Sequence, residues 1–351
     1  MVTILDVAKQ AGVAPITVSR VVNNAPGVNQ KTRDRVNKAI AELHYVPNAM
    51  AKSLRSKKTH IIALVLTDVT NPFWTTIARG VEDTAAKNGF HVILCNTDEN
   101  PEKESNYITV LLQRRIDGLV LAPSSADRRR LLPLKRQDIP CILIDRQVGG
   151  FKTDVVRSDG KEGARQLTEH LIGLGHRRIA MISGPAHIST AEERLAGYCQ
   201  ALQEHGIPVE ESLIKQGSYK EENSFQFVKE LLSVTPPPTA IFASNNLVAV
   251  GALQALREAG LQVPEDMALV CFDDIPQASA IYPFLTVCAQ DPYKMGCVAA
   301  DLLIDRIKSN RRKSREIVLD TKLIIRKSSG QALAKREGRA IELAEKRLES
   351  L

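Results

Sequence analysis

Polar and aromatic residues that follow predicted strands have the chemistry of a binding site. Asp145 and Asp273 each close an apolar, strand-like run, and Trp74, the only Trp in the chain, follows another. A carboxylate in such a place can accept hydrogen bonds from a ligand, or it can cap a turn. The Trp74 ring can stack on a sugar or a base, or it can be the first core residue of a helix. Arg194 opens a helical run and can contact a ligand or form a surface salt bridge.

Sequence motifs of common enzymes and cofactor sites are absent. There is no G-x-G-x-x-G, P-loop, G-x-S-x-G or H-E-x-x-H motif, and no paired acid and base stands out. The six cysteines lack C-x-x-C spacing, and four lie in apolar runs, which predicts reduced thiols in a cytoplasmic protein. With neither a signal-peptide core nor a membrane-length apolar run, we predict a cytoplasmic binding protein that is no enzyme and uses no cofactor or metal.

The excess positive charge lies at the N-terminal end. The net charge is +7, and residues 1–60 contain ten Lys and Arg against three acids, so the rest of the chain sums to zero. A small basic module on a neutral body is typical of a protein that binds a polyanion. The length of 351 residues allows two or three domains.

Residues 3–23 predict two short helices joined by a turn. Thr3 and Asp6 have the spacing of a capping box, so the first helix should begin at Ile4. Gly12 should end it, and Pro15 suits the first turn of the next helix, where no N–H is needed. Short helix pairs occur in many all-α domains, but this one fits a helix-turn-helix, whose second helix enters the DNA major groove.

From Ile61 onward, apolar strand-like runs alternate with helical runs. Continuous apolar strands followed by helices predict parallel sheets covered on both faces. The number of elements predicts two doubly wound subdomains with a ligand cleft at the carboxyl ends of the strands. The expected strands are 61–66, 92–95, 118–122, 141–145, 179–183, 240–243, 268–272 and 285–289.

Residues 3–329 resemble the LacI/GalR family of bacterial repressors. The likeness rests on the stretch Thr3–Asn23 and on body motifs such as Asp68-Val-Thr-Asn-Pro-Phe-Trp74 and Phe272-Asp-Asp274. It implies an all-α helix-turn-helix headpiece and an α/β body with the bilobed fold of periplasmic sugar-binding proteins. The implied parts are a headpiece (1–46), a hinge helix and linker (47–59) and a bilobed effector-binding and dimerisation body (60–329). An extra helical tail (330–351) is expected to follow them.

Within that body, the resemblance places one lobe at about 60–158 and 290–318 and the other at about 159–289 and 319–329. The chain would then cross between lobes near Ser158, Gln290 and Leu319. Composition alone favours a plain linker at residues 48–58, whereas the resemblance implies a hinge helix that reads the DNA minor groove.

The resemblance implies a repressor that binds a palindromic operator as a dimer and responds to a small effector, most often a sugar or sugar derivative. A nucleobase or a phosphoprotein co-repressor are alternatives, as are an extracytoplasmic solute receptor and a carbohydrate-acting enzyme for the protein as a whole. The expected DNA contacts are Thr3, Pro15, Ile16, Thr17, Ser19, Arg20, Asn23, Ala51, Lys52, Leu54 and Arg55, with Leu54 as a wedge between base pairs. The expected effector contacts are Asp68, Asn71, Phe73, Trp74, Thr190, Arg194, Tyr219, Asn245 and Asp273.

Two positions depart from the family pattern, and the tail extends beyond it. Ala14 replaces the Ser that usually caps the second helix, and Asn246 replaces the Asp that usually follows Asn245. In the tail, apolar residues repeat at spacings of 3, 4 and 3, as in a coiled coil, at Ile341, Ala344, Leu348 and Leu351. Only about two heptads fit, so a frayed or docked helix is the favoured expectation and tetramerisation is the alternative.

Overall fold

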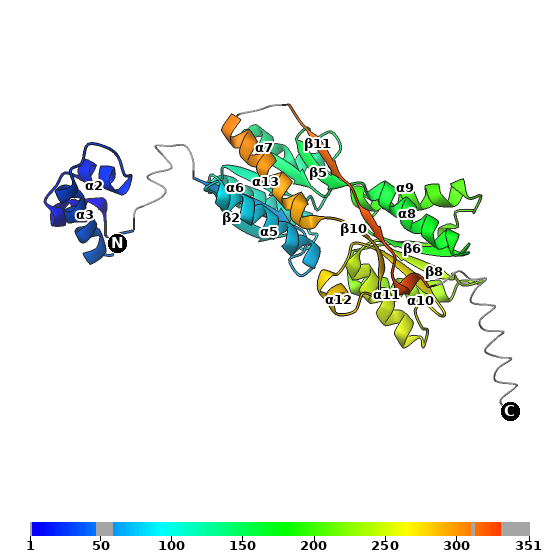
Figure 1. The fold of residues 1–351 in the computed structure, drawn as a ribbon. Helices are drawn as coiled ribbons and strands as arrows, with labels where there is room; N and C mark the ends of the chain where they lie inside the picture. Colours follow the sequence, from blue (N-terminus) through cyan, green and yellow to red (C-terminus); the bar gives the residue numbers. More distant parts are fainter. Residues whose placement is uncertain (1, 47–58, 310–312, 331–351) are drawn as a thin grey trace. The chain divides into compact units, whose positions relative to one another are not determined.

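The computed structural model describes residues 2–46, 59–309 and 313–330 (Figure 1). The chain divides into two compact units, Met1–Thr59 and His60–Leu351. In the described part of the first unit, residues 2–46 form three helices, α1 (Ile4–Ala11), α2 (Pro15–Val22) and α3 (Gln30–Glu42). The predicted helix ends are confirmed, because Thr3 and Asp6 form a capping box and Gly12 ends α1 with a φ of 62°. The hinge residues Ala51, Lys52, Leu54 and Arg55 and the tail repeat lie outside the described residues.

A small core of valines and alanines holds the three helices together. Its fully buried members are Val7, Ala8, Ala11, Val18, Val21, Val36 and Ala39. Asn29 caps α3 with its side chain, whereas α2 begins at Ala14 without a side-chain cap. The absent cap removes a contribution of about 0.5–2 kcal/mol from the stability of α2.

The first sheet of the second unit has the strand order β11-β5-β4-β3-β1-β2, with every pairing parallel. Its strands are β1 (Ile61–Leu66), β2 (His91–Asn96), β3 (Gly118–Leu121), β4 (Cys141–Ile144), β5 (Asp154–Ser158) and β11 (Glu316–Leu319). One face packs on α5 (Pro72–Lys87) and α13 (Pro292–Ser309). The other packs on α6 (Pro101–Gln113) and α7 (Leu132–Arg136), which follows the 3-10 helix η1 (Arg128–Leu131). Burial of both faces explains why β1 is apolar throughout.

The second sheet has the strand order β12-β10-β9-β8-β6-β7. Its strands are β6 (Ile179–Ser183), β7 (Ile214–Gln216), β8 (Ala240–Ala243), β9 (Ala268–Phe272), β10 (Thr286–Ala289) and β12 (Lys322–Ile324). Helices α8 (Gly160–Gly173) and α9 (Ser189–Glu204) pack on one face, and α10 (Glu221–Leu232) and α11 (Asn246–Glu258) on the other. The short helices α12 (Pro276–Ile281), η2 (Glu211–Leu213) and η3 (Lys327–Ser329) complete this part.

The predicted fold class, two doubly wound subdomains behind a helical headpiece, is confirmed. The predicted strand set was incomplete, because β5, β7, β11 and β12 are short or carry charged residues that hide their apolar pattern. One pairing also departs from an all-parallel sheet, since β12 runs antiparallel to β10.

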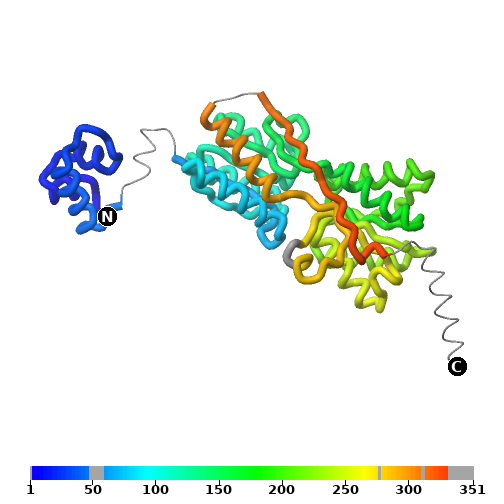
Figure 2. Tube along the Cα trace, viewed as in Figure 1, coloured from blue at the N-terminus to red at the C-terminus, as the bar shows by residue number. Residues whose placement is uncertain are grey.

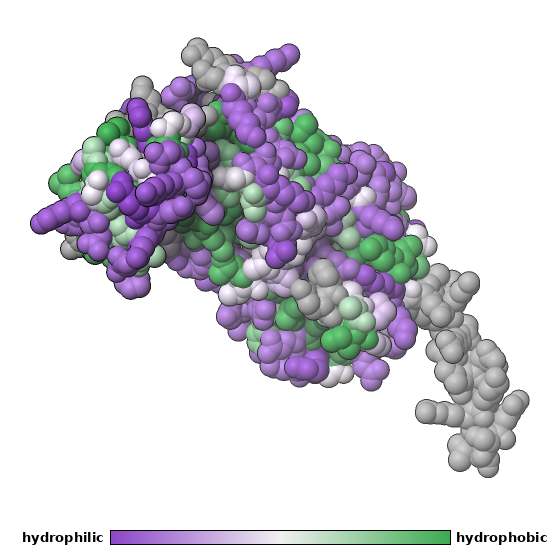
Figure 3. All heavy atoms as spheres, turned by 60° about the vertical axis from the view of Figure 1, so that its left-hand side comes forward, coloured by the Kyte–Doolittle hydropathy of each residue, from purple (hydrophilic) through white to green (hydrophobic). Residues whose placement is uncertain are grey.

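Three segments carry the chain from one sheet to the other. They follow Ser158, Ala289 and Leu319, and the last is the red trace in Figure 2. Hydrophilic residues cover most of the face shown in Figure 3, with hydrophobic patches between them. Among the residues described, no helix combines the length and apolarity that a membrane span requires.

Candidate functional site

Helix α2 presents one face to the headpiece core and exposes the other. Val18 and Val21 are buried, while Pro15, Ile16 and Arg20 are exposed. An exposed face of this kind, on the second helix of a helix-turn-helix, can read base edges in the major groove. The Arg20 guanidinium has the fork geometry that pairs with guanine.

The other four predicted headpiece contacts differ in how free their side chains are. The Thr3 hydroxyl is committed to the α1 cap, where it donates to Asp6 Oδ2 at 2.7 Å. Asn23 is exposed, but its amide donates to Ser19 O at 2.7 Å. Thr17 and Ser19 are half-buried. DNA contact by these residues stays a prediction.

A cavity of about 430 Å³ lies at the carboxyl ends of strands from both sheets of the second unit. Ligands of doubly wound folds bind at this edge. All nine predicted effector contacts line it, namely Asp68, Asn71, Phe73, Trp74, Thr190, Arg194, Tyr219, Asn245 and Asp273. Their role as effector contacts stays a prediction. Seven further lining residues carry charge, namely Asp98, Glu99, Asp145, Arg146, Lys220, Glu221 and Glu222. Of these, only Asp145 stood out in the sequence, as a carboxylate at the end of a strand.

Arg146 is a central residue of the cavity that the sequence analysis did not select. Its side chain is only 3% exposed, and it donates to both carboxylate oxygens of Glu99 at 2.6 Å. The guanidinium lies 5.8 Å from the Trp74 ring centre and 5.7 Å from that of Tyr219. Its Nε atom has no hydrogen-bond partner among the described residues. The available signal was an Asp-Arg pair directly after the apolar run of β4.

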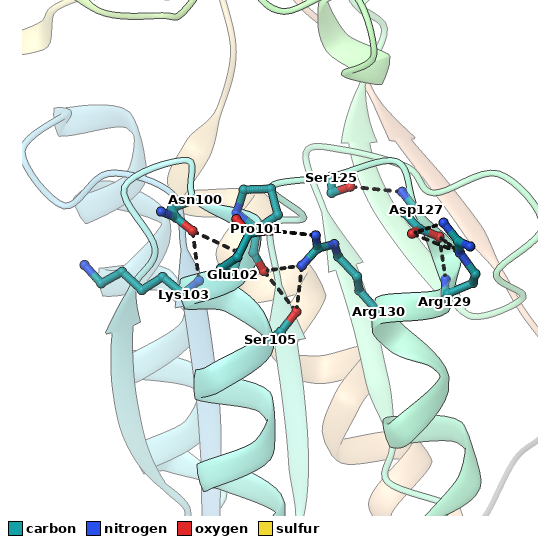
Figure 4. Close-up of polar contacts among 9 residues, drawn as sticks. All are labelled: Asn100, Pro101, Glu102, Lys103, Ser105, Ser125, Asp127, Arg129 and Arg130. Atoms are coloured by element: carbon teal, nitrogen blue, oxygen red, sulfur yellow. Dashed lines mark hydrogen bonds and ion pairs between the residues drawn. The ribbon is translucent and has the colours of Figure 1, made fainter.

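The loop that carries Glu99 is fixed by the start of α6. The Asn100 side chain caps α6 by accepting from the N–H groups of Glu102 and Lys103 at 2.9 Å. Arg130 reaches across from η1 and donates to Pro101 O at 3.0 Å and to Glu102 Oε1 at 2.8 Å (Figure 4). These contacts fix the backbone that directly follows Glu99, whose carboxylate accepts from Arg146.

Arg194 and Asp273 are a second buried cation and carboxylate of the cavity, and the charge of each acts on the other. Arg194 is 4% exposed, donates to Ser244 O at 2.6 Å and lies 3.9 Å from the Phe272 ring centre. Its Nε atom finds no partner in the described structure. Asp273 accepts from Gln290 Nε2 at 2.5 Å. Burial raises the pKa of Asp273, although Arg194 and Gln290 oppose the rise.

Asp145 is a buried carboxylate of the cavity that stays available to a ligand. It is 7% exposed, and in the described structure its side chain accepts no hydrogen bond, with Arg146 Nε 3.8 Å away. Burial raises its pKa to about 6, against the opposing charges of Arg194 and Arg146. Asp145 and Asp273 both have a positive φ, 65° and 71°, which turns the chain sharply at the ends of β4 and β9. Non-glycine residues seldom adopt this conformation, and it is concentrated at functional sites.

Two aromatic side chains form apolar walls of the cavity. The Trp74 ring meets Phe73 edge to face, with ring centres 5.0 Å apart. Tyr219 Oη lies 3.2 Å from Thr190 Oγ1, and the Tyr219 ring lies against the backbone of Gly184. A Cβ atom at Gly184 would stand 2.1 Å from the Tyr219 ring, so only glycine fits there.

A pair of buried amides joins the two sheets beside the cavity. Asn71 and Asn246 donate to each other's side-chain oxygens at 2.9 Å in both directions. An Asp at position 246 could only accept from Asn71, so the departure from the family pattern replaces a carboxylate contact with a reciprocal one. Asn245 caps α11 by accepting from Val248 N at 2.8 Å.

The cavity as a whole carries more negative than positive charge. Its lining holds three cationic side chains, Arg146, Arg194 and Lys220, against seven carboxylates, Asp68, Asp98, Glu99, Asp145, Glu221, Glu222 and Asp273. Across the described residues, no group of His, Cys, Asp and Glu side chains has the arrangement of a metal site. Buried acceptors, buried donors and flat apolar walls suit a neutral ligand with several hydroxyl groups.

Two family models match nearly the whole chain. Residues 3–48 match the bacterial regulatory proteins of the lacI family, and residues 59–327 match the periplasmic binding proteins and sugar binding domain of the LacI family. The chain belongs to the LacI family. It is a DNA-binding transcriptional regulator and not an enzyme, as predicted.

Comparison of this LacI-family regulator with individual proteins gives the same family as the family models. It is 36% identical to the HTH-type transcriptional regulator DegA of Bacillus subtilis over 330 residues, which cover 93% of this chain and 98% of DegA. It is also 36% identical to a ribose operon repressor of Halalkalibacterium halodurans over 332 residues, 94% of this chain and 97% of that one. The structure of a lac repressor dimer bound to operator matches with a TM-score of 0.81 at 29% identity, covering 94% of this chain and 99% of the other.

Proposed function

We propose that this protein is a cytoplasmic repressor that binds a palindromic operator as a dimer and is switched by a neutral sugar in the cavity between its two sheets. The observation that carries the proposal is the charge pattern of the cavity. Arg146 already pairs with the Glu99 carboxylate, and the negative charges of Asp273 and Asp145 act on Arg194, so carboxylates of the protein already offset the charge of both buried arginines. A phosphate or carboxylate on the ligand would meet the surplus of lining carboxylates.

The hydrogen-bonding groups of the cavity support a sugar in particular. The Asp145 carboxylate can accept from hydroxyl groups, and the guanidinium groups of Arg146 and Arg194 line the same cavity as donors. The Trp74 and Tyr219 rings supply apolar faces on which a sugar ring can rest. One relative's name, ribose operon repressor, points to the same ligand class.

Exposed apolar residues support a dimer. Ile93 and Leu94 on the edge strand β2 are 39% and 48% exposed, and Ile281 and Tyr282 beyond the second sheet are 87% and 58% exposed. Apolar edge strands that stay uncovered promote association. A two-fold dimer would present its headpieces to two half-sites related by a dyad. The matched lac repressor structure is a dimer on operator.

Titration calorimetry with D-ribose, D-glucose, ribose 5-phosphate and hypoxanthine tests the ligand class. We expect a neutral sugar to bind and to change the fluorescence of Trp74, since no other Trp contributes. Ribose 5-phosphate should bind at least about tenfold more weakly than ribose, because of the carboxylate surplus. Tighter binding of the phosphate ester, or binding of hypoxanthine alone, would overturn the assignment.

A further inference from the structure

The amino-terminal edge of the first sheet carries a concentration of positive charge that the cavity and the headpiece do not explain. Five segments lead into the strands there: 87–91, 114–117, 135–140, 149–154 and the described part of 308–315. They hold nine Lys and Arg against three Asp. Eight of the cations are exposed, and we call this set the basic edge: Lys87, Arg114, Arg115, Lys135, Arg136, Lys152, Lys308 and Lys313.

Two of the three carboxylates in these segments, Asp117 and Asp154, already accept hydrogen bonds within the protein. Asp154 is fully buried and accepts from both Arg306 and Arg315. Asp117 accepts from the backbone N–H of His60 at 2.8 Å. Residues 61–351 carry no net charge, and the cavity at the opposite edge of the same sheet has a carboxylate surplus. The body is therefore polarised, with its positive end at the basic edge.

Hydrogen bonds between the segments show that they are neighbours. Leu119 N donates to Pro140 O at 2.9 Å, which sets the 114–117 and 135–140 segments side by side. Lys308 Nζ donates to Asn88 Oδ1 at 2.9 Å, which joins the ends of α13 and α5.

The basic edge is also where the chain enters the body from the headpiece. His60 O accepts from His91 N at 2.8 Å, and Ile61 O accepts from Asp117 N at 2.8 Å. In the sequence, only twelve residues, 47–58, separate the described headpiece from the described start of the body. At about 3.6 Å per extended residue and about 3.4 Å per base pair, a chain of that length reaches at most about 15 base pairs along DNA, which sets the length of flanking DNA to test.

We propose that the basic edge contacts the phosphates of DNA flanking the operator, as a second, sequence-independent binding surface. The inference rests on the proposed function, because the headpiece must first hold the DNA. Lysines and arginines that face the backbone displace condensed counterions and strengthen binding without reading bases. Exposed charges act over only about 8 Å at physiological salt, so the surface must lie directly against the duplex.

Operator affinity on two duplexes tests the proposal in the full-length protein. One duplex holds the operator alone, and the other extends it by about 15 base pairs on each side. The variant replaces Arg114, Lys135 and Arg136 by Gln, and the matched control replaces Lys161, Arg257 and Lys322, which are exposed cations of the other lobe. On the long duplex we expect the variant to lose at least about tenfold in affinity and its salt slope to fall by about five, because the dimer loses six cations at about 0.9 each. On the short duplex it should bind like wild type.

The other outcomes overturn the proposal. Equal losses on both duplexes would place the contacts inside the operator or indicate damage to the fold, which the Trp74 fluorescence and melting temperature would report. Equal losses in the control variant would show only the effect of net charge. Unchanged binding on both duplexes would show that the basic edge does not contact the flanking DNA, and another acidic macromolecule would then be its candidate partner. If the wild type bound neither duplex, the proposed function itself would fall, and the two failures are thus distinguishable.

Discussion

At the scale of single residues, the ligand chemistry depends on buried carboxylates and arginines that hold one another in place. Arg146 anchors on Glu99 and leaves Asp145 with an open carboxylate. Breaking a buried pair leaves an uncompensated charge, which costs about 3–5 kcal/mol. Substitutions among these buried charged residues should therefore strongly weaken ligand binding. They should have little direct effect on the exposed face of α2, because α2 belongs to the other unit.

Asp145 makes ligand binding dependent on pH. Its pKa of about 6 in the folded protein lies above the usual value, so it binds a proton as the pH falls through 6. The neutral carboxyl group then accepts hydrogen bonds from ligand hydroxyls more weakly than the carboxylate does. At pH 5 only about a tenth would be ionised. We expect the dissociation constant for D-ribose to rise about tenfold between pH 7.5 and pH 5. The raised pKa of Asp273 acts in the same direction, and no His lines the cavity in the described structure.

Calorimetry at both pH values measures this effect. Asp145→Asn is the control, because it should bind more weakly at pH 7.5 and show a smaller change on acidification. A wild-type affinity that is constant over this range would remove Asp145 from the ligand contacts.

At the scale of elements, the caps decide how firmly the recognition helix is held. Ala14 offers no side-chain acceptor to α2, whereas Asn29 accepts from Thr32 N at 2.8 Å at the start of α3. Ala14→Ser should supply the missing acceptor and stabilise α2 by about 1 kcal/mol. The amides of the first turn of α2 should then exchange with solvent about fivefold more slowly.

Hydrogen–deuterium exchange of the full-length chain checks this prediction. Asn29→Ala is the matched control, because it removes an existing cap and should speed exchange in the first turn of α3. Equal exchange in wild type and Ala14→Ser would mean that Pro15 alone sets the start of α2.

Prediction from the sequence worked best where a local signal, such as a helix cap or a continuous apolar run, decides the structure. The capping box, Gly12 and the apolar runs of β1, β3, β6 and β8 follow local rules, and the structure confirms them. The edge strands β7, β11 and β12 were not predicted, because strands at a sheet edge tolerate charged residues that hide the apolar pattern. Arg146 was not predicted as a cavity residue, because its role depends on Glu99, Trp74 and Tyr219, which are distant in the sequence and come together only in the fold. No local sequence pattern encodes such an arrangement of side chains.

At the scale of the whole molecule, the exposed apolar side chains of β2 should hold two copies together. Leu94→Glu places a charge on this edge strand and should convert the dimer to a monomer in sedimentation velocity. Val318→Glu is the matched control, because Val318 is 44% exposed on β11, the opposite edge strand of the same sheet. A Leu94→Glu protein that stays dimeric would place the dimer interface elsewhere.

Regulation requires that sugar binding in the cavity be coupled to DNA binding by the headpiece. A sugar shifts the protein only by its different affinity for two arrangements of the lobes, and DNA must alter sugar affinity by the same factor. The buried Asn71–Asn246 pair and the three crossing segments are the connections that such a rearrangement would have to move.

Fluorescence anisotropy of labelled operator DNA, titrated with protein in the presence and absence of D-ribose or whichever neutral sugar binds by calorimetry, tests that claim most directly. We predict that the sugar changes the operator affinity of wild type by about 5–150-fold. Asp273→Asn and Arg194→Ala should bind operator like sugar-free wild type and should not respond to the sugar. If both variants responded at the wild-type sugar concentration, or if saturating sugar left wild-type affinity unchanged, the cavity would not be the regulatory site.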